Sequence, residues 1–145
     1  MNTRIATRSD ADLLLPALEA FSREDEIQWN PGCVSGLGTL LQDATLGFVL
    51  IAEHEGRLCG YAILTYGFDL EFGGRDSYLT EFYLSPAVRG RGFGKQLLDA
   101  VERNARDNGA NAMHLCVRPE NVVAINTYRR AGFVRAPRDL FTKTL

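Results

Sequence analysis

The sequence lacks the features that mark a nucleic-acid or membrane protein. Its 16 lysines and arginines are balanced by 18 aspartates and glutamates, which gives a formal net charge of −2. There is therefore no overall basic excess with which to bind nucleic acid non-specifically. The longest apolar runs, such as residues 48–52, fall far short of the roughly 20 residues that span a bilayer. We expect neither nucleic acid nor a membrane as a partner.

Cysteine and histidine are also scarce: the chain holds only Cys33, Cys59, Cys116, His54 and His114. The cysteines form no C-x-x-C pair, and neither histidine lies at the spacing of a zinc motif. We therefore expect no metal, and reduced thiols in a reducing compartment. The N-terminal stretch MNTRIATRSD has no apolar segment of the kind found in signal peptides, so the expected location is the cytoplasm.

The composition that remains is that of an ordinary small globular domain. The 145 residues are 46% apolar and 23% charged, and no linker, charge block or internal repeat divides them. A chain of this length buries roughly 68% of its unfolded surface, so it can form a core without disulfides or a metal. We expect a single domain over residues 1–145.

The hydrophobic pattern predicts an α/β (α+β) domain built on one mixed, twisted sheet. Apolar residues recur at helical spacing over residues 11–23, 34–42, 93–107 and 122–131. Strand-like runs of β-branched, aromatic and other apolar residues occupy residues 4–7, 48–53, 58–66, 77–84, 113–117, 133–135 and 140–144. The prediction is therefore six to seven strands with about four helices.

The most informative stretch is a glycine-rich loop between a predicted strand and an amphipathic helix, Arg89-Gly90-Arg91-Gly92-Phe93-Gly94-Lys95. Three glycines in five positions disfavour the start of a helix, so their presence indicates that the backbone amides must be accessible, without Cβ atoms beside them. The amides of such a loop can surround an anion, and the N-terminus of the following helix adds partial positive charge. Because Arg89, Arg91 and Lys95 stand beside these amides, the loop suits a pyrophosphate. The alternative is a turn with surface arginines and no ligand.

Two other phosphate-binding motifs are excluded by the residues at three positions, 89, 95 and 96. A Walker A loop would need glycine at position 89 and serine or threonine at 96, where the chain has Arg89 and Gln96. A dinucleotide fingerprint starting at Gly90 would need glycine at position 95, which is Lys95. The sequence therefore supports neither a P-loop NTPase nor a Rossmann oxidoreductase.

The loop resembles a signature of the GNAT superfamily of N-acetyltransferases, a strand followed by Arg/Gln-x-x-Gly-x-Gly/Ala at the start of a helix. Residues 89–94 match every fixed position. A second family signature is an asparagine after the next strand, followed on a short helix by Asn/Ala, Tyr and Gly-Phe. Its matches here are Asn121, Ala124, Asn126, Tyr128, Gly132 and Phe133. The resemblance runs from about residue 4 to residue 133.

The resemblance implies that the protein binds acetyl-CoA and transfers its acetyl group to an amine. It places the pyrophosphate on residues 89–95 and the pantetheine arm between two splayed parallel strands, residues 80–84 and 113–117. The residues that it implies beside the arm are Phe82, Tyr83, Leu84, Asn121 and Asn126. For the two asparagines, a helix N-cap and a surface polar residue are the alternatives.

The resemblance also implies direct attack of a neutral amine on the thioester. Tyr128 stands where the family has the general acid that protonates the leaving thiolate, and a core tyrosine is the alternative. Some members carry a catalytic glutamate at the position of Cys116, so that base is absent here.

Glu81 is then the candidate base, because an acid inside an apolar strand would have a raised pKa. A water chain to solvent is the alternative. Alternation puts Thr80 and Phe82 on one face of the strand and Glu81 on the other, so a bulge would decide which face meets the cofactor.

The segments expected to form the acceptor pocket are rich in acids and aromatics: Glu24, Asp25, Glu26, Trp29, Asp69, Glu71, Phe72 and Asp76. Such a lining favours a cationic amine, although a solvated acidic loop is an alternative. Residues 75–82 are somewhat similar to the corresponding region of diamine acetyltransferases. That group has two adjacent acids where this chain has Thr80 and Glu81, and the loss of one acid argues against a polyamine substrate. We expect a small primary amine first and a protein N-terminus or lysine second. A non-catalytic acetyl-CoA sensor is the competing class, and a homodimer stays open.

Overall fold

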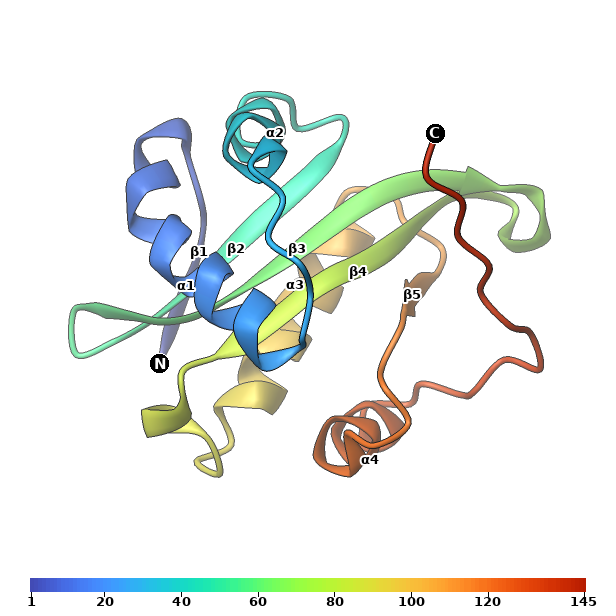
Figure 1. Ribbon diagram of the computed structural model, residues 1–145. Coiled ribbons are helices and arrows are strands. Elements are labelled where there is room, and N and C mark those ends of the chain that lie inside the picture. Colours follow the sequence, from blue (N-terminus) through green and yellow to red (C-terminus); the bar gives the residue numbers. More distant parts are fainter.

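A computed structural model describes residues 1–145 and contains one five-stranded sheet with helices on both faces (Figure 1). The strand order is that of the chain, and every neighbouring pair is antiparallel except the last, which is parallel. No helix is both long and apolar enough for a membrane crossing. The elements are β1 (Asn2–Ile5), α1 (Ala11–Glu24), α2 (Gly32–Leu40), β2 (Gly47–His54), β3 (Arg57–Asp69), β4 (Gly74–Leu84), α3 (Phe93–Asp107), β5 (Met113–Leu115) and α4 (Val122–Arg130).

The sheet separates two apolar clusters, which define its two faces. Along β2, Phe48 and Leu50 pack in the cluster under α3, whereas Val49 and Ile51 pack in the cluster under α1 and α2. Figure 1 shows the same division, with α1 and α2 in front of the sheet and α3 behind it. We call these sides the α3 face and the α1/α2 face. The mixed α/β architecture predicted from the sequence is confirmed.

The predicted number of strands is wrong, because neither C-terminal strand, at residues 133–135 and 140–144, is formed. Pro137 lies between the two stretches and has no amide proton to give to a strand ladder. Arg138 instead pairs with Glu71 through two bonds of 2.7 and 2.9 Å. Apart from the partly buried Phe133, the large apolar side chains of this segment are at least 69% exposed: Val134, Leu140, Phe141 and Leu145. The sheet therefore ends at β5.

A bulge in β4 decides the orientation that strand alternation left open. Leu79 pairs with Leu64 and Glu81 pairs with Ile63, so Thr80 has no partner residue in β3. The Thr80 hydroxyl donates to the Ile63 carbonyl at 3.2 Å. Since one extra residue separates them, Leu79 faces α3 while Glu81 lies opposite Ile63 on the α1/α2 face.

The two parallel strands, β4 and β5, are paired over a short distance only. The pairs join residues 77, 78 and 79 of β4 with residues 113, 114 and 115 of β5. β5 ends at Leu115, whereas β4 continues to Leu84, so residues 80–84 have no strand beside them on that edge. The predicted separation of the two parallel strands is present at this end of β4, but their predicted central position is wrong, because β5 is the edge strand of the sheet.

Candidate functional site

The glycine-rich loop follows β4 and forms the N-terminus of α3. Gly90 and Gly92 have φ angles of 73° and 78°, in the left-handed region that glycine adopts at least cost. Gly92 is the N-cap residue of α3, and no side chain caps this helix. The first amides of α3 therefore have no acceptor from a capping side chain, which is the arrangement that binds phosphate groups.

Two further residues of the loop anchor it to the rest of the domain. Phe93 is buried in the cluster on the α3 face, and a Cβ added to Gly94 would lie 3.7 Å from the Leu84 side chain. The start of α3 is thus held against the end of β4 by packing. The backbone amides of the loop have a fixed position relative to the strand edge.

Lys95 and Arg91 of the loop are exposed and have partners within the protein. The Lys95 ammonium lies 2.6 Å from Asp99, one helical turn further on. The Arg91 guanidinium lies 5.1 Å from the centre of the Phe93 ring and 3.3 Å from His54 Nε2. Exposed contacts of this kind contribute little free energy, so an anion can compete for both cations.

Arg89 connects the loop with two other elements. Its Nε donates to the Leu84 carbonyl at 2.8 Å, and its Nη2 lies 2.5 Å from the Glu24 carboxylate at the end of α1. Both side chains are about half exposed, at 46% and 42%. Arg89 therefore binds a main-chain acceptor at the free edge of β4 and an acid of α1, the helix on the α1/α2 face of the sheet.

The free edge of β4 presents main-chain groups to the space that β5 leaves open. The Ser85 amide donates to the Cys59 carbonyl at 2.8 Å, which directs residue 85 toward β3. Because bonding directions alternate along an antiparallel ladder, the main chain of Phe82 and Leu84 points away from β3, whereas that of Tyr83 points toward it. An extended chain with amide groups could bind along Phe82 and Leu84 as an added strand does.

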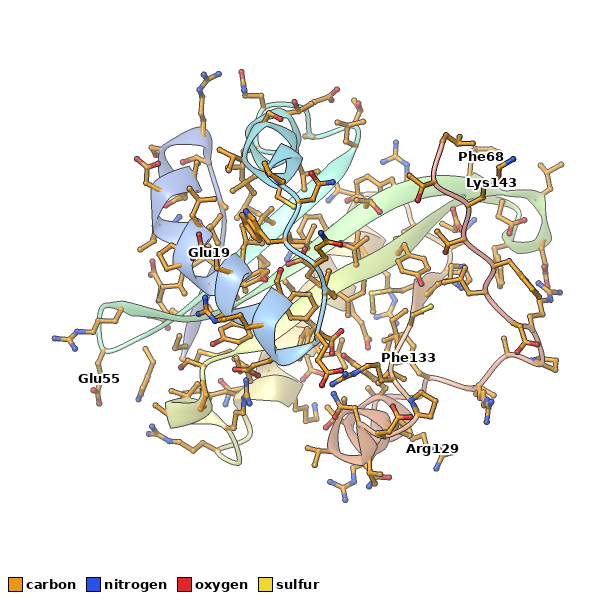
Figure 2. The ribbon with its side chains drawn as sticks, viewed as in Figure 1. Glu19, Glu55, Phe68, Arg129, Phe133 and Lys143 are labelled. Carbon is orange, nitrogen blue, oxygen red and sulfur yellow. The ribbon has the colours of Figure 1, made fainter.

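Tyr128 of α4 lies beside this free edge. Its ring meets the rings of Phe82 and Phe133 edge to face, with centroids 6.2 and 5.8 Å apart. Figure 2 shows Phe133 on the sheet side of α4, with Arg129 on the outer side of the helix. Burial, with a smaller contribution from the negative charge of Asp25, raises the pKa of Tyr128 to about 12. The phenol therefore keeps its proton at neutral pH.

The two asparagines of the second signature have different surroundings. Asn121 is the N-cap of α4, where its side-chain oxygen accepts from the Ala124 amide at 3.1 Å. Asn126 is exposed on the same helix, two residues before Tyr128. The side chain of Asn121 therefore caps α4, as the alternative to cofactor binding predicted.

Glu81 lies on the α1/α2 face, where it is half-buried and accepts a hydrogen bond of 2.6 Å from the Tyr61 hydroxyl. Burial raises the pKa of Glu81, and this hydrogen bond, which favours the charged form, partly opposes the rise. Tyr61 has no place in either sequence signature. Its contact with Glu81 spans 20 positions of the chain and depends on the bulge at Thr80.

Three consecutive acids at the end of α1, residues 24–26, are tied to the ends of both parallel strands. Arg89, after β4, binds Glu24. Arg118, three residues after β5, lies 3.4 Å from Asp25 and 3.3 Å from Glu26, and donates to the Glu24 carbonyl at 3.4 Å. No sequence motif connects Arg118 with residues 24–26, since the contact joins residues 94 positions apart.

The other acids and the phenylalanine expected to line the acceptor pocket lie at the opposite end of β4. Asp76 is 3.4 Å from His114 Nε2, and the Phe72 ring meets the His114 ring at a centroid distance of 5.0 Å. Asp69 accepts from the Glu71 amide at 2.9 Å. The predicted acidic and aromatic lining is therefore divided into two groups, and only residues 24–26 lie at the strand ends.

Other parts of the surface lack a comparable arrangement of groups. One hollow of about 470 Å³ lies between α1 and the β2–β3 hairpin, and another of about 420 Å³ lies between α3, β5 and the C-terminal segment. Neither is lined by the glycine-rich loop or by Glu81. No three histidine, cysteine or acidic side chains are grouped so that they could hold a metal ion.

Comparisons with known proteins point to one family. The Acetyltransferase (GNAT) family matches residues 11–133. A protein named uncharacterized N-acetyltransferase Mb2688, from Mycobacterium bovis, is 38% identical over 85 residues, 59% of this chain and 51% of that protein. The L-amino acid N-acyltransferase MnaT of Escherichia coli is 31% identical over 87 residues, 59% of this chain and 49% of MnaT. The chain thus spans about half the length of these curated relatives.

A solved structure has the same fold over nearly the whole chain. The integron cassette protein HFX_CASS3, from the mobile metagenome of Cole Harbour Salt Marsh, has a TM-score of 0.87 and 26% identity, with 99% of this chain and 90% of that chain covered. The family match and this shared fold agree with the glycine-rich loop and the separated parallel strands. The chain belongs to the Acetyltransferase (GNAT) family.

Proposed function

We propose that the protein is an acetyl-CoA-dependent N-acetyltransferase that acts on a primary amine of a small molecule, and that residues 1–145 form its single catalytic domain. The observation that carries the proposal is the position of the uncapped N-terminus of α3 directly beside the free edge of β4. The first feature suits a diphosphate, and the second suits an arm that carries amides. Acetyl-CoA has both groups.

Particular residues would hold each part of this co-substrate. The diphosphate would bind the backbone amides of residues 90–95, with Arg89, Arg91 and Lys95 as its cations. The arm would bind the main chain of Phe82 and Leu84, which requires Arg89 to leave the Leu84 carbonyl. Asn126, which is exposed on α4, is included because it matches the second family signature. The side chains of Asn121 and Tyr83 have partners within the protein, so these two residues would contribute by holding the backbone of their segments in place.

The acetyl-CoA thioester supplies a carbonyl carbon open to attack by a neutral amine. Glu81 accepts the proton that the substrate ammonium must lose, directly or through one water molecule. The nitrogen–carbon bond forms, the carbon–sulfur bond breaks, and Tyr128 donates its proton to the departing sulfur. The bonded nitrogen then loses its second proton, which returns to the Tyr128 phenolate through solvent, so the products are the N-acetyl amide, the CoA thiol and the one proton taken up by Glu81. The raised pKa of Tyr128, about 12, keeps this proton available at neutral pH.

A cationic small molecule is the acceptor that the surroundings favour. The acids at residues 24–26 lie at the ends of the parallel strands and attract positive charge, although two arginines offset part of it. The name of MnaT describes an enzyme that acylates L-amino acids, which are small amines. The acids would attract any ammonium group, so the preference for a small primary amine over a protein N-terminus or lysine rests on the similarity to MnaT.

The test is an assay of thiol release from acetyl-CoA with a panel of small primary amines, amino acids and peptides, with mass spectrometry of the product. We expect release of CoA and formation of an N-acetyl product with at least one small amine. If acetyl-CoA raises the melting temperature but no amine releases thiol, the protein is a non-catalytic binder and the proposed function is wrong.

A further inference from the structure

The hydroxyl of Tyr61 is a polar group inside an apolar cluster. Tyr61 is 0% exposed and packs in the cluster under α1 and α2, together with Leu14, Val49 and Ile51. Burying a hydroxyl costs free energy unless it is hydrogen-bonded. A phenylalanine would fill the same space without that cost. Packing alone therefore does not account for a tyrosine at position 61.

The single partner of this hydroxyl is the carboxylate of Glu81. Tyr61 pairs with Tyr83 across the ladder, and Glu81 lies two residues before Tyr83 on the same face. The Tyr61 hydroxyl donates to Glu81 Oε2 at 2.6 Å. Burial and the charge of Glu81 raise the pKa of Tyr61 far above its usual value, so Tyr61 stays the donor. The second oxygen, Oε1, has no such partner.

The hydrogen bond from Tyr61 is also what stabilises the charged form of Glu81. The pKa of Glu81 is raised by burial and lowered by Tyr61, and no arginine or lysine contributes. The other ionisable groups that face the pair are Tyr83 from β4 and Cys33 from α2. A carboxylate without a cation nearby depends on such a donor for both its orientation and its charge.

We propose that Tyr61 is a positioning residue, which holds Oε2 of Glu81 and thereby directs Oε1 toward the substrate ammonium. The inference rests on the proposed function, because it assigns Tyr61 a role through the proposed base. Tyr61 itself touches no substrate. It fixes one rotamer of the carboxylate and sets the pH at which Glu81 can accept a proton.

The experiment compares Tyr61→Phe with Tyr66→Phe, and follows kcat and KM against pH. Tyr66 is a matched control on the same strand, since its buried hydroxyl faces α3 and has no hydrogen-bond partner. In Tyr61→Phe the charged carboxylate loses its donor, so the acidic limb of kcat/KM should move up by about one pH unit. We expect kcat to fall about fivefold at neutral pH, while KM for acetyl-CoA stays constant. Tyr66→Phe should leave the profile unchanged.

Two further measurements separate a positioning role from a structural one. In a Glu81→Gln background, Tyr61→Phe should lower kcat no further, because both changes act on one proton transfer. A carbon-detected NMR titration of the Glu81 carboxyl in the resting protein should show the same upward shift in Tyr61→Phe. A lower melting temperature with an unchanged acidic limb would overturn the inference. Absence of amine turnover in the unmodified protein would overturn the proposed function instead, and the resting titration would still report on the Tyr61–Glu81 pair.

Discussion

The part of the proposed site that would hold the cofactor is made mainly of backbone, whereas the part that would receive the amine is made of side chains from separate elements. The first consists of residues 89–95 and the free edge of β4. The second consists of two contacts, the Tyr61–Glu81 pair between β3 and β4, and the pairing of Arg118 after β5 with Asp25 and Glu26 after α1. A backbone site needs a contiguous motif, but a side-chain site needs correct long-range packing.

The largest effect should come from breaking the backbone part at Gly92. Gly92→Val places a β-branched residue at a φ of 78°, a conformation that costs L residues about 1–2 kcal/mol or more. The start of α3 should change conformation, so acetyl-CoA should no longer raise the melting temperature.

The matched control for Gly92→Val is Gly36→Val, at an α2 position where an added Cβ meets no atom within 4 Å. Thermal denaturation with and without acetyl-CoA measures both variants. A normal acetyl-CoA response in Gly92→Val would remove the loop from the cofactor site, and an unchanged melting temperature of the unmodified protein would refute cofactor binding altogether.

How far the sequence predicted the two parts follows from this difference. The helix over residues 93–107 has the predicted bounds, because its apolar spacing and its glycine-rich start lie in one stretch of chain. The bulge at Thr80 could not be predicted, since large apolar side chains lie on both faces of β4 and hide the shift that an inserted residue makes in the alternation. Tyr61 and Arg118 depend on contacts between distant elements. The two C-terminal strands were predicted from apolar residues that, apart from Phe133, the structure leaves exposed.

The next largest effect should be that of Tyr128→Phe, which tests the acid where the two parts meet. Removal of the phenolic proton donor should lower kcat about 100-fold, because the sulfur would then leave as an unprotonated thiolate. The ring contacts with Phe82 and Phe133 persist in phenylalanine, so the dissociation constant of acetyl-CoA should hardly change. Steady-state kinetics and a binding isotherm measure the two quantities, and full activity in this variant would exclude the acid role.

A smaller effect is expected for Glu81→Gln, which tests the side-chain part alone. Glu81 can accept a proton only when ionised, so the rate of the unmodified enzyme should fall as pH drops through the raised pKa of Glu81. Glutamine removes that ionisation, and activity should then rise only as the amine itself loses its proton at higher pH. We expect roughly a 30-fold lower kcat at neutral pH. An unshifted pH profile would favour the water chain as the base.

The smallest effect should come from Glu24→Gln, which cuts the contact that joins the two parts. Arg89 binds Glu24 and the Leu84 carbonyl in the same conformation, so both contacts oppose its movement toward a diphosphate. The pair is about half exposed and contributes at most about 1 kcal/mol, so acetyl-CoA should bind about twofold to fivefold more tightly in Glu24→Gln. Glu55→Gln removes the same charge at the tip of the β2–β3 hairpin (Figure 2) and should leave the affinity unchanged. Because salt screens an exposed pair, the gain should shrink as ionic strength rises. Weaker binding in Glu24→Gln would mean that Glu24 holds Arg89 ready for the cofactor, and the two parts would then assist rather than oppose one another.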